Sequence, residues 1–297
     1  MQFEKPKFFK EKPLEEEVEK RFEKEKIPWS AKIILQRHGE FYQATEDQPE
    51  FKEWQKKGIL GMLTEKGIKE TREFTKRKLE EILESKKAVD ILFLYSPTEW
   101  YDYYDPEKGW QKGFGGSRGK HTMKVILDTL ADELKKRNLK KDKIRILGIG
   151  PQDKLRELNI FYIVSAEDPQ AYFKALQKKF GKDEWWEPYY NIVKDLEPLR
   201  KKIGAEGPKD LSKRIETLVK IIDLWRNKIQ KDSERNVVVW MVTHKEMMRC
   251  FLQYGLNFGD KVKGWTPATN ETVEISFSPE NKIFVEFRGK RHEIQEI

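Results

Sequence analysis

The chain has 297 residues, with 59 Lys and Arg against 51 Asp and Glu, and a formal charge of +8. Its 17 Phe, 10 Tyr and 9 Trp supply enough bulky apolar surface for a packed core, which argues against global disorder. The single cysteine, Cys250, rules out both an intrachain disulfide and a cysteine zinc cluster. A reducing, cytoplasmic compartment fits this cysteine usage best.

The charges are interleaved rather than gathered. Lys and Glu alternate through most of the chain, which is typical of a solvated surface and argues against a nucleic-acid partner. The first 12 residues lack the apolar stretch of a signal peptide. The longest apolar run, 237–242, is far shorter than the ~20 residues that cross a bilayer. We therefore expect neither a membrane segment nor a nucleic-acid partner.

Hydrophobic patterning predicts alternating strands and helices. Compact apolar runs indicate buried strands, and apolar residues at helical spacing indicate helices. In chain order, the expected elements are a charged helix over 15–26, a strand over 31–36, a helix over 68–85 with Thr64 as its N-cap, strands over 89–95 and 143–148 on either side of a helix over 121–137, a mostly helical stretch over 159–231, a strand over 236–242, a helix over 246–256, and a closing hairpin of strands over 272–278 and 282–287.

This order predicts an α/β fold, a three-layer sandwich with a mostly parallel central sheet and helices on both faces. Residues 1–30 are expected to form a charged helical appendage, and residues 31–297 a single domain. Two insertions interrupt that domain, an aromatic one near 98–117 with loop composition and a helical one near 159–231. In such sheets, ligands bind at the carboxyl ends of the strands.

Two of the four histidines, His38 and His244, directly follow apolar strands. A lone histidine in such a place is usually structural, but two of them at one sheet edge, with Arg37 beside the first, indicate an oxyanion site. The guanidinium of arginine fits phosphate oxygens with two parallel hydrogen bonds. A neutral imidazole among cations can attack phosphorus while the cations stabilise the developing charge.

Arg37-His38-Gly39 at the end of the first strand resembles the opening motif of the histidine phosphatase superfamily, whose fold is phosphoglycerate-mutase-like. Further segments resemble motifs of that family in the family's order. They are Leu63 to Gly67 for L-T-x-x-G, Ser96-Pro97 for S-P, Arg118 to Thr122 for the Arg and Thr that normally follow S-P, Leu155 to Leu158 for the segment with the acid, Val242-Thr243-His244 for V-S-H, and Thr269 to Val273 for an Asn-containing segment before a strand.

The resemblance implies a set of roles. His38 would be the nucleophile that becomes a phosphohistidine, and Arg37, Arg118 and His244 would form the phosphate pocket. Glu157 would protonate the leaving oxygen and then activate water. The family's chemistry uses no metal and no cofactor, because fixed cations supply the electrostatic stabilisation.

The general acid is the least certain of these roles, because it differs among branches of the family. Asp153 and Glu99 are alternatives to Glu157, which is otherwise a plain surface carboxylate. The mutase branch surrounds its acid with Asn, Arg and Tyr that hold a second phosphate, and the sequence around Glu157 does not resemble that pattern. The resemblance therefore favours a phosphatase over a mutase.

The chain also departs from the family pattern near the pocket. Phe41 and Ala44 stand where the family has polar residues aimed at phosphate, and Lys245 stands where it usually has Gly. The aromatic insertion is expected either to pack as a satellite core at the sheet edge or to cover the pocket as a lid. The candidates for substrate binding are Gln43, Glu99, Trp100 and Lys245.

The remaining reactive side chains are expected to be structural. His121 is interpreted as a residue on a helix face, His292 as a solvated residue of a basic tail, and Cys250 as a core residue. The leading hypothesis is a metal-independent phosphatase that hydrolyses a small organic phosphomonoester through a phosphohistidine. The alternative is a catalytically weak or inactive phosphatase-like module that binds a phospho-ligand or a protein partner.

Overall fold

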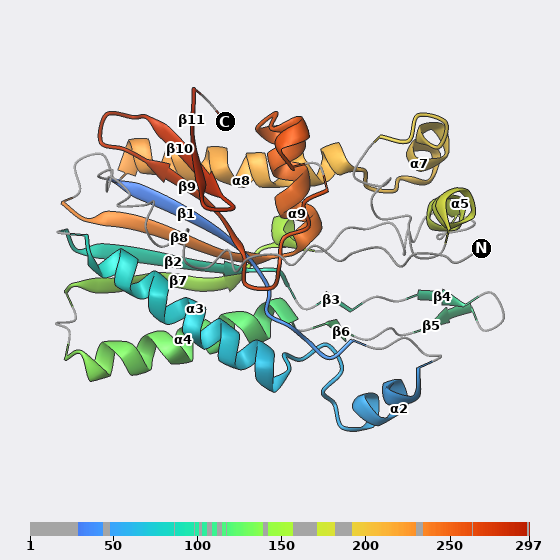
Figure 1. Ribbon diagram of the computed structural model, residues 1–297, viewed down its shortest axis with the longest axis horizontal. Helices are drawn as coiled ribbons and strands as arrows, with labels where there is room; N and C mark the ends of the chain where they lie inside the picture. The colour runs from blue at the N-terminus through green and yellow to red at the C-terminus, as the bar shows by residue number, and fades with distance from the viewer. Residues whose placement is uncertain are drawn as a thin grey trace, which may run out of the picture.

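The computed structural model describes residues 29–43, 48–85, 87–97, 99–100, 103–105, 109–111, 115–116, 118–138, 142–156, 171–181, 192–229, 234–262, 264–295 and 297 (Figure 1). The helix predicted over 15–26 lies outside these residues. No helix in the described part of the chain is both long and apolar enough to cross a membrane.

The helices and strands of the described residues follow in chain order. The elements are β1 (Ala31–Arg37), α2 (Pro49–Lys56), α3 (Glu65–Leu83), β2 (Val89–Tyr95), β3 (Glu99–Trp100), β4 (Tyr103–Asp105), β5 (Gly109–Gln111), β6 (Gly115–Gly116), α4 (Arg118–Lys136), β7 (Ile144–Pro151), η1 (Asp153–Leu155), α5 (Ala171–Phe180), α7 (Glu197–Ile203), α8 (Pro208–Ile229), β8 (Asn236–Thr243), α9 (Lys245–Cys250), η2 (Phe251–Gly255), η3 (Gly259–Val262), β9 (Thr272–Phe277), β10 (Ile283–Phe287) and β11 (Lys290–Ile294).

One seven-stranded sheet organises the fold, with the strand order β11-β10-β9-β1-β8-β2-β7. The four strands β1, β8, β2 and β7 pair in parallel, and β9 to β11 extend the sheet antiparallel from β1. Figure 1 shows α3 and α4 on one side of this sheet and α8 and α9 on the other. The predicted three-layer α/β fold is therefore confirmed.

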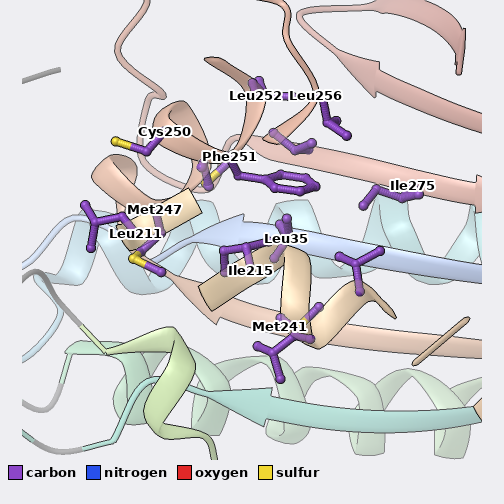
Figure 2. Packing of buried hydrophobic residues seen from close by; sticks show 14 of the residues in the cluster. Leu35, Leu211, Ile215, Met241, Met247, Cys250, Phe251, Leu252, Leu256 and Ile275 are labelled. Atoms are coloured by element: carbon purple, nitrogen blue, oxygen red, sulfur yellow. The ribbon is translucent and has the colours of Figure 1, made fainter. Parts of the chain in front are cut away.

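Alternation along β1 and β8 divides the core between the two faces. In β1, Ile34 packs into the layer of α3 and α4, while Ile33 and Leu35 pack into the layer of α8 and α9. In β8, Trp240 joins the first layer and Met241 the second. Both strands are buried on both faces, which explains why their sequences are continuous apolar runs rather than alternating ones. Figure 2 shows the second layer, where side chains of the sheet meet those of α8 and α9.

The end of the chain differs from the prediction. His292, expected in a solvated tail, lies half-buried in β11, and its ring stacks on Phe287 with centroids 5.4 Å apart. Arg288 and Gly289 adopt φ values of 51° and 67°. This left-handed geometry is that of a two-residue hairpin turn, which folds the basic tail back onto β10 as an edge strand.

The aromatic insertion near 98–117 also differs from the loop that its composition predicts. Its described backbone forms two short ribbons, β3 with β6 and β4 with β5. In Figure 1 they extend outward from the end of the sheet where β2 ends. The side chains of these ribbons lie outside the described residues, so the satellite core and the lid both stay predictions.

A buried ion triad fastens α3 to the sheet. The carboxylate of Glu274, in β9, lies 3.1 Å from the ammonium group of Lys32 in β1 and also pairs with Lys78 in α3. Burial raises the pKa of Glu274, but the two ammonium groups more than offset this effect and lower the pKa to about 2. The site therefore holds a charged carboxylate that neutralises two cations in a water-poor place.

Glu274→Gln should lower the free energy of unfolding by about 3 kcal/mol, because it removes the buried carboxylate that pairs with Lys32 and leaves Lys78 with the exposed Glu81. The matched control is Glu81→Gln, which removes the other carboxylate beside Lys78. The Glu81 side chain is 48% exposed, and its carboxylate lies 2.6 Å from the ammonium group of Lys78. That exposed pair should contribute less than about 1 kcal/mol. Urea denaturation of both variants checks the difference, and equal losses would contradict it.

Candidate active site

Three neighbouring parallel strands deliver the residues of the site. The register places Arg37 of β1 opposite Thr243 of β8. The next residues are His38 and His244, whose ring centroids lie 5.3 Å apart. Ser96 follows β2 on the other side of β8 and continues the ladder by donating its backbone N–H to Val242. The structure therefore brings both predicted histidines together at the carboxyl edge of the sheet.

The orientation of His38 leaves one ring nitrogen for chemistry. Its imidazole is 3% exposed, and Nδ1 lies 2.8 Å from the carbonyl oxygen of Gly39. Because a carbonyl can only accept, Nδ1 carries the proton and donates it. The lone pair of the neutral ring is therefore at Nε2. The backbone N–H of Gly39 donates to the hydroxyl of Thr122 in α4, which fixes this turn to the helix.

His244 has the opposite tautomer. The guanidinium of Arg118 donates from Nε to Nδ1 of His244 at 3.3 Å, so in the neutral ring the proton is on Nε2. That nitrogen lies 3.1 Å from Oγ of Ser96 and donates to it. A Cβ added to Gly119 would approach this same hydroxyl to 2.4 Å, so glycine lets the start of α4 lie against the end of β2.

Burial and positive charge keep both imidazoles neutral. Burial is the main cause that lowers the pKa of His38 well below 6.5, and the charges of Arg118 and Arg37 lower it further. Burial also lowers the pKa of His244, followed by the charges of Arg118 and Arg214. These arginines place positive charge around the two rings, although Arg214 also pairs with Glu206 at 3.4 Å. The first turn of α4 adds the positive end of a helix dipole.

Arg37 is held by a segment from the far end of the sequence. Its Nη1 donates to the carbonyl of Pro267 at 2.5 Å, and its backbone N–H donates to Glu271 at 3.0 Å. Asn270 completes the contact, since its backbone N–H donates to the carbonyl of Arg37 at 3.2 Å. Segment 267–271 therefore fixes both the backbone and the side chain of this arginine.

The start of α3 presses against the turn after His38. Thr64 is the N-cap, as predicted, and accepts from the backbone N–H of Gly67 at 2.9 Å. A Cβ added to Gly67 would lie 2.1 Å from the carbonyl oxygen of Glu40, a contact that no side chain could make. The L-T-x-x-G pattern therefore has a physical reason here, because glycine permits the close approach of two backbones.

The other predicted site residues are exposed, lie near the start of α9, or have side chains outside the described residues. Gln43 is exposed, and Lys245 begins α9 with its ammonium group 3.9 Å from the carboxylate of Glu246. Asp153, an alternative acid, is exposed in η1. The backbones of Glu99 and Trp100 lie in β3, but their side chains are outside the described residues. Glu157 is outside them as well, so its role stays a prediction.

Two residues near the histidines were not among the predicted site residues. Ser96 was noted only as part of a motif, although its strand-end position was the available signal. Arg214 lies in α8, with a side chain 12% exposed and Nη2 3.2 Å from Sδ of Met247. Nothing in the sequence separates Arg214 from other arginines on amphipathic helices. In the described part of the chain, no cluster of three or more His, Cys, Asp or Glu could hold a metal ion.

No family model matches the chain, and no curated protein matches it. Several solved structures match the chain. A phosphoglycerate mutase from Bacillus anthracis is 15% identical, with 88% of this chain and 93% of that chain covered and a TM-score of 0.48. A mycobacterial glucosyl-3-phosphoglycerate phosphatase is 12% identical, with 86% and 96% covered and a TM-score of 0.41. A variant of phosphoserine phosphatase from Entamoeba histolytica is 13% identical, with 90% and 96% covered and a TM-score of 0.38.

The names of these structures say what those proteins do, and at 12–15% identity the likeness concerns the fold alone.

Gly67→Ala should destabilise the fold, because the new methyl group must displace the turn that follows His38. Alanine alone would stabilise a helix by up to about 1 kcal/mol relative to glycine, so a loss of stability isolates the contact. Gly150→Ala in β7, where an added Cβ meets nothing within 4 Å, is the matched control. Thermal unfolding of both variants checks this expectation, and an equal loss of stability in Gly150→Ala would contradict it.

The buried histidines should also make stability depend on pH. Their folded pKa values lie below the unfolded value of 6.5, so below about pH 6.5 the unfolded chain binds more protons and the free energy of unfolding falls. Each histidine adds up to about 1.4 kcal/mol per pH unit to this loss. His244→Gln should flatten the slope between pH 6.5 and 5 and leave the slope above pH 7 unchanged. Urea denaturation across this range measures both slopes.

Proposed function

We propose that this protein is a metal-independent phosphatase that hydrolyses a small organic phosphomonoester through a phosphohistidine on His38. The observation that carries the proposal is the hydrogen bond from Nδ1 of His38 to the carbonyl of Gly39. It fixes a tautomer with its lone pair at Nε2, in a buried place beside a second histidine and among arginines. A neutral nucleophile amid fixed cations suits attack on a phosphate.

In the first step, Nε2 of His38 attacks phosphorus and forms a P–N bond while the bond from phosphorus to the ester oxygen breaks. Arg37 and Arg118 supply positive charge where charge builds up on the phosphoryl oxygens. The leaving alkoxide takes a proton from a carboxylic acid, which we assign to Glu157. The products of this step are the free alcohol, a carboxylate and the phosphohistidine.

In the second step, water attacks phosphorus and the P–N bond breaks. The carboxylate formed in the first step accepts a proton from this water, so it is an acid again at the end of the cycle. The electron pair of the broken bond returns to Nε2, and inorganic phosphate leaves. In both steps the proton remains on Nδ1, which donates it in a hydrogen bond to the Gly39 carbonyl. This hydrogen bond keeps the ring in one orientation.

The lowered pKa of His38 supports the same role. Burial, Arg118 and Arg37 keep the pKa well below 6.5, so the nucleophile remains unprotonated at mildly acidic pH. His244, also neutral, donates from Nε2 to Ser96 and accepts from Arg118. These two contacts connect Arg118, through His244, to Ser96 at the end of β2.

His38→Ala should lower phosphate release from p-nitrophenyl phosphate by about 10³-fold or more, because it removes the atom that bonds to phosphorus. The assay contains EDTA, so that turnover by the wild type tests independence from a metal. His292→Ala, at the remote edge strand β11, is the matched control and should retain activity. Wild-type protein quenched in alkali during turnover should carry a phosphoryl group that acid removes.

Two outcomes would contradict the proposal. The first is turnover that survives in His38→Ala, which would assign the nucleophile elsewhere. The second is a folded wild type that binds inorganic phosphate but releases none from a broad panel of phosphomonoesters. That result would favour the binding module, and partners would then be sought by capture on the immobilised protein.

A further inference from the structure

Phe41 lies between two residues of the proposed pocket. The guanidinium carbon of Arg118 is 4.6 Å from the centroid of the Phe41 ring, which is well within cation–π range. The ring of His38 lies on another side, with centroids 5.0 Å apart and planes at 81°. One phenyl ring therefore contacts both the proposed nucleophile and the arginine that would hold the phosphate.

The backbone fixes the position of this ring. Phe41 pairs with Leu63 in an antiparallel bridge. The next residue, Tyr42, donates its N–H to Met62 at 2.9 Å and accepts from Gly61 at 2.9 Å. Hydrogen bonds on both sides of the bridge tie this segment to the chain just before α3. The backbone of Phe41 is therefore held in place by these contacts.

The contact restricts how Arg118 can lie. The negative face of the ring attracts the guanidinium, and a planar guanidinium stacks well on an aromatic face. At the same time, Nε of Arg118 donates to Nδ1 of His244 at 3.3 Å. The cation–π contact and this hydrogen bond together restrict rotation of the Arg118 side chain. Its orientation is then set before any phosphate binds, which lowers the entropy lost on binding.

The sequence gives this position its interest, because the family pattern has a polar residue aimed at phosphate near here. Phe41 cannot donate a hydrogen bond to a phosphate oxygen. In place of a neutral donor, this position therefore has an aromatic ring that contacts the guanidinium of Arg118. Among the described residues, a similar stack of Arg on Phe occurs between Arg226 and Phe277, at 4.7 Å.

We propose that Phe41 is a positioning residue that orients Arg118 for the phosphoryl group and takes the place of a direct polar contact to phosphate. This inference rests on the proposed function, because it assigns the phosphate to the pocket of His38 and Arg118. It implies that phosphate affinity depends on the aromatic ring itself and not on apolar bulk at this position.

The test compares Phe41→Leu, which keeps an apolar side chain but loses the ring, with Phe41→Tyr, which keeps the ring. Isothermal titration measures the Kd of inorganic phosphate, and p-nitrophenyl phosphate gives kcat and KM. Phe41→Leu should weaken phosphate affinity and lower kcat/KM by about threefold to thirtyfold, the range of a partly desolvated cation–π contact. Phe41→Tyr should stay within about twofold of the wild type.

Phe277→Leu is the matched control, since it removes the comparable Arg226 stack. Phe277 of β9 pairs with Ala31, at the opposite end of β1 from His38. Seven residues of strand separate the two places by roughly 20 Å. This variant should lose thermal stability and keep the wild-type phosphate affinity. A merely structural effect of losing an aromatic ring would therefore not reproduce the Phe41→Leu result.

The outcomes separate this inference from the proposed function. The role of the ring would be overturned if Phe41→Leu bound phosphate with the wild-type affinity. It would also be overturned if Phe41→Tyr lost as much phosphate affinity as Phe41→Leu. A wild type that binds phosphate without turnover would overturn the phosphatase and leave the affinity series as the test of Phe41. A folded wild type that neither binds phosphate nor releases it from an ester would overturn both.

Discussion

The parallel pairing of β1 with β8 is the constraint on which the site depends. Both strands end at the same edge in register, so the residue after each strand falls beside the residue after the other. If either strand slipped by one residue in this register, its side chains would change face and its histidine would no longer lie beside the other. The register is enforced by burial on both faces, where Ile34 and Trp240 fill one layer and Leu35 and Met241 the other. Core packing thus sets the geometry of the polar site.

The same burial shapes the electrostatics of the site. Two imidazoles and nearby guanidiniums are gathered in a water-poor place, where like charges would repel strongly. The fold resolves this conflict by keeping the imidazoles neutral and directing each ring proton to a neutral acceptor, the Gly39 carbonyl for His38 and the Ser96 hydroxyl for His244. Under the proposed function, an arriving phosphate dianion would be attracted by the positive charge of these guanidiniums.

The sequence indicated the strand ends well and the side-chain contacts poorly. Continuous apolar runs identified β1, β2 and β8, and a polar residue with glycine in the first turn identified the start of α3. β11 was missed because its residues, Lys290 to Ile294, carry no apolar run and depend on a hairpin turn for their pairing. The contacts of Arg118 with Phe41 and of Arg214 with Met247 depend on helices that approach from distant parts of the chain, and no local pattern records such approaches.

The bond from Arg37 to Pro267 joins residues that are 230 positions apart. During synthesis, the ribosome therefore releases His38 long before the segment that fixes its neighbouring arginine exists. Until β8 and β9 emerge, β1 lacks both of its partners in the sheet. Such long-range closure makes for slow folding and a nascent chain that is prone to aggregate. The proposed phosphate pocket and the core thus depend on the same late-emerging segments, and a chain that stalls before they emerge completes neither.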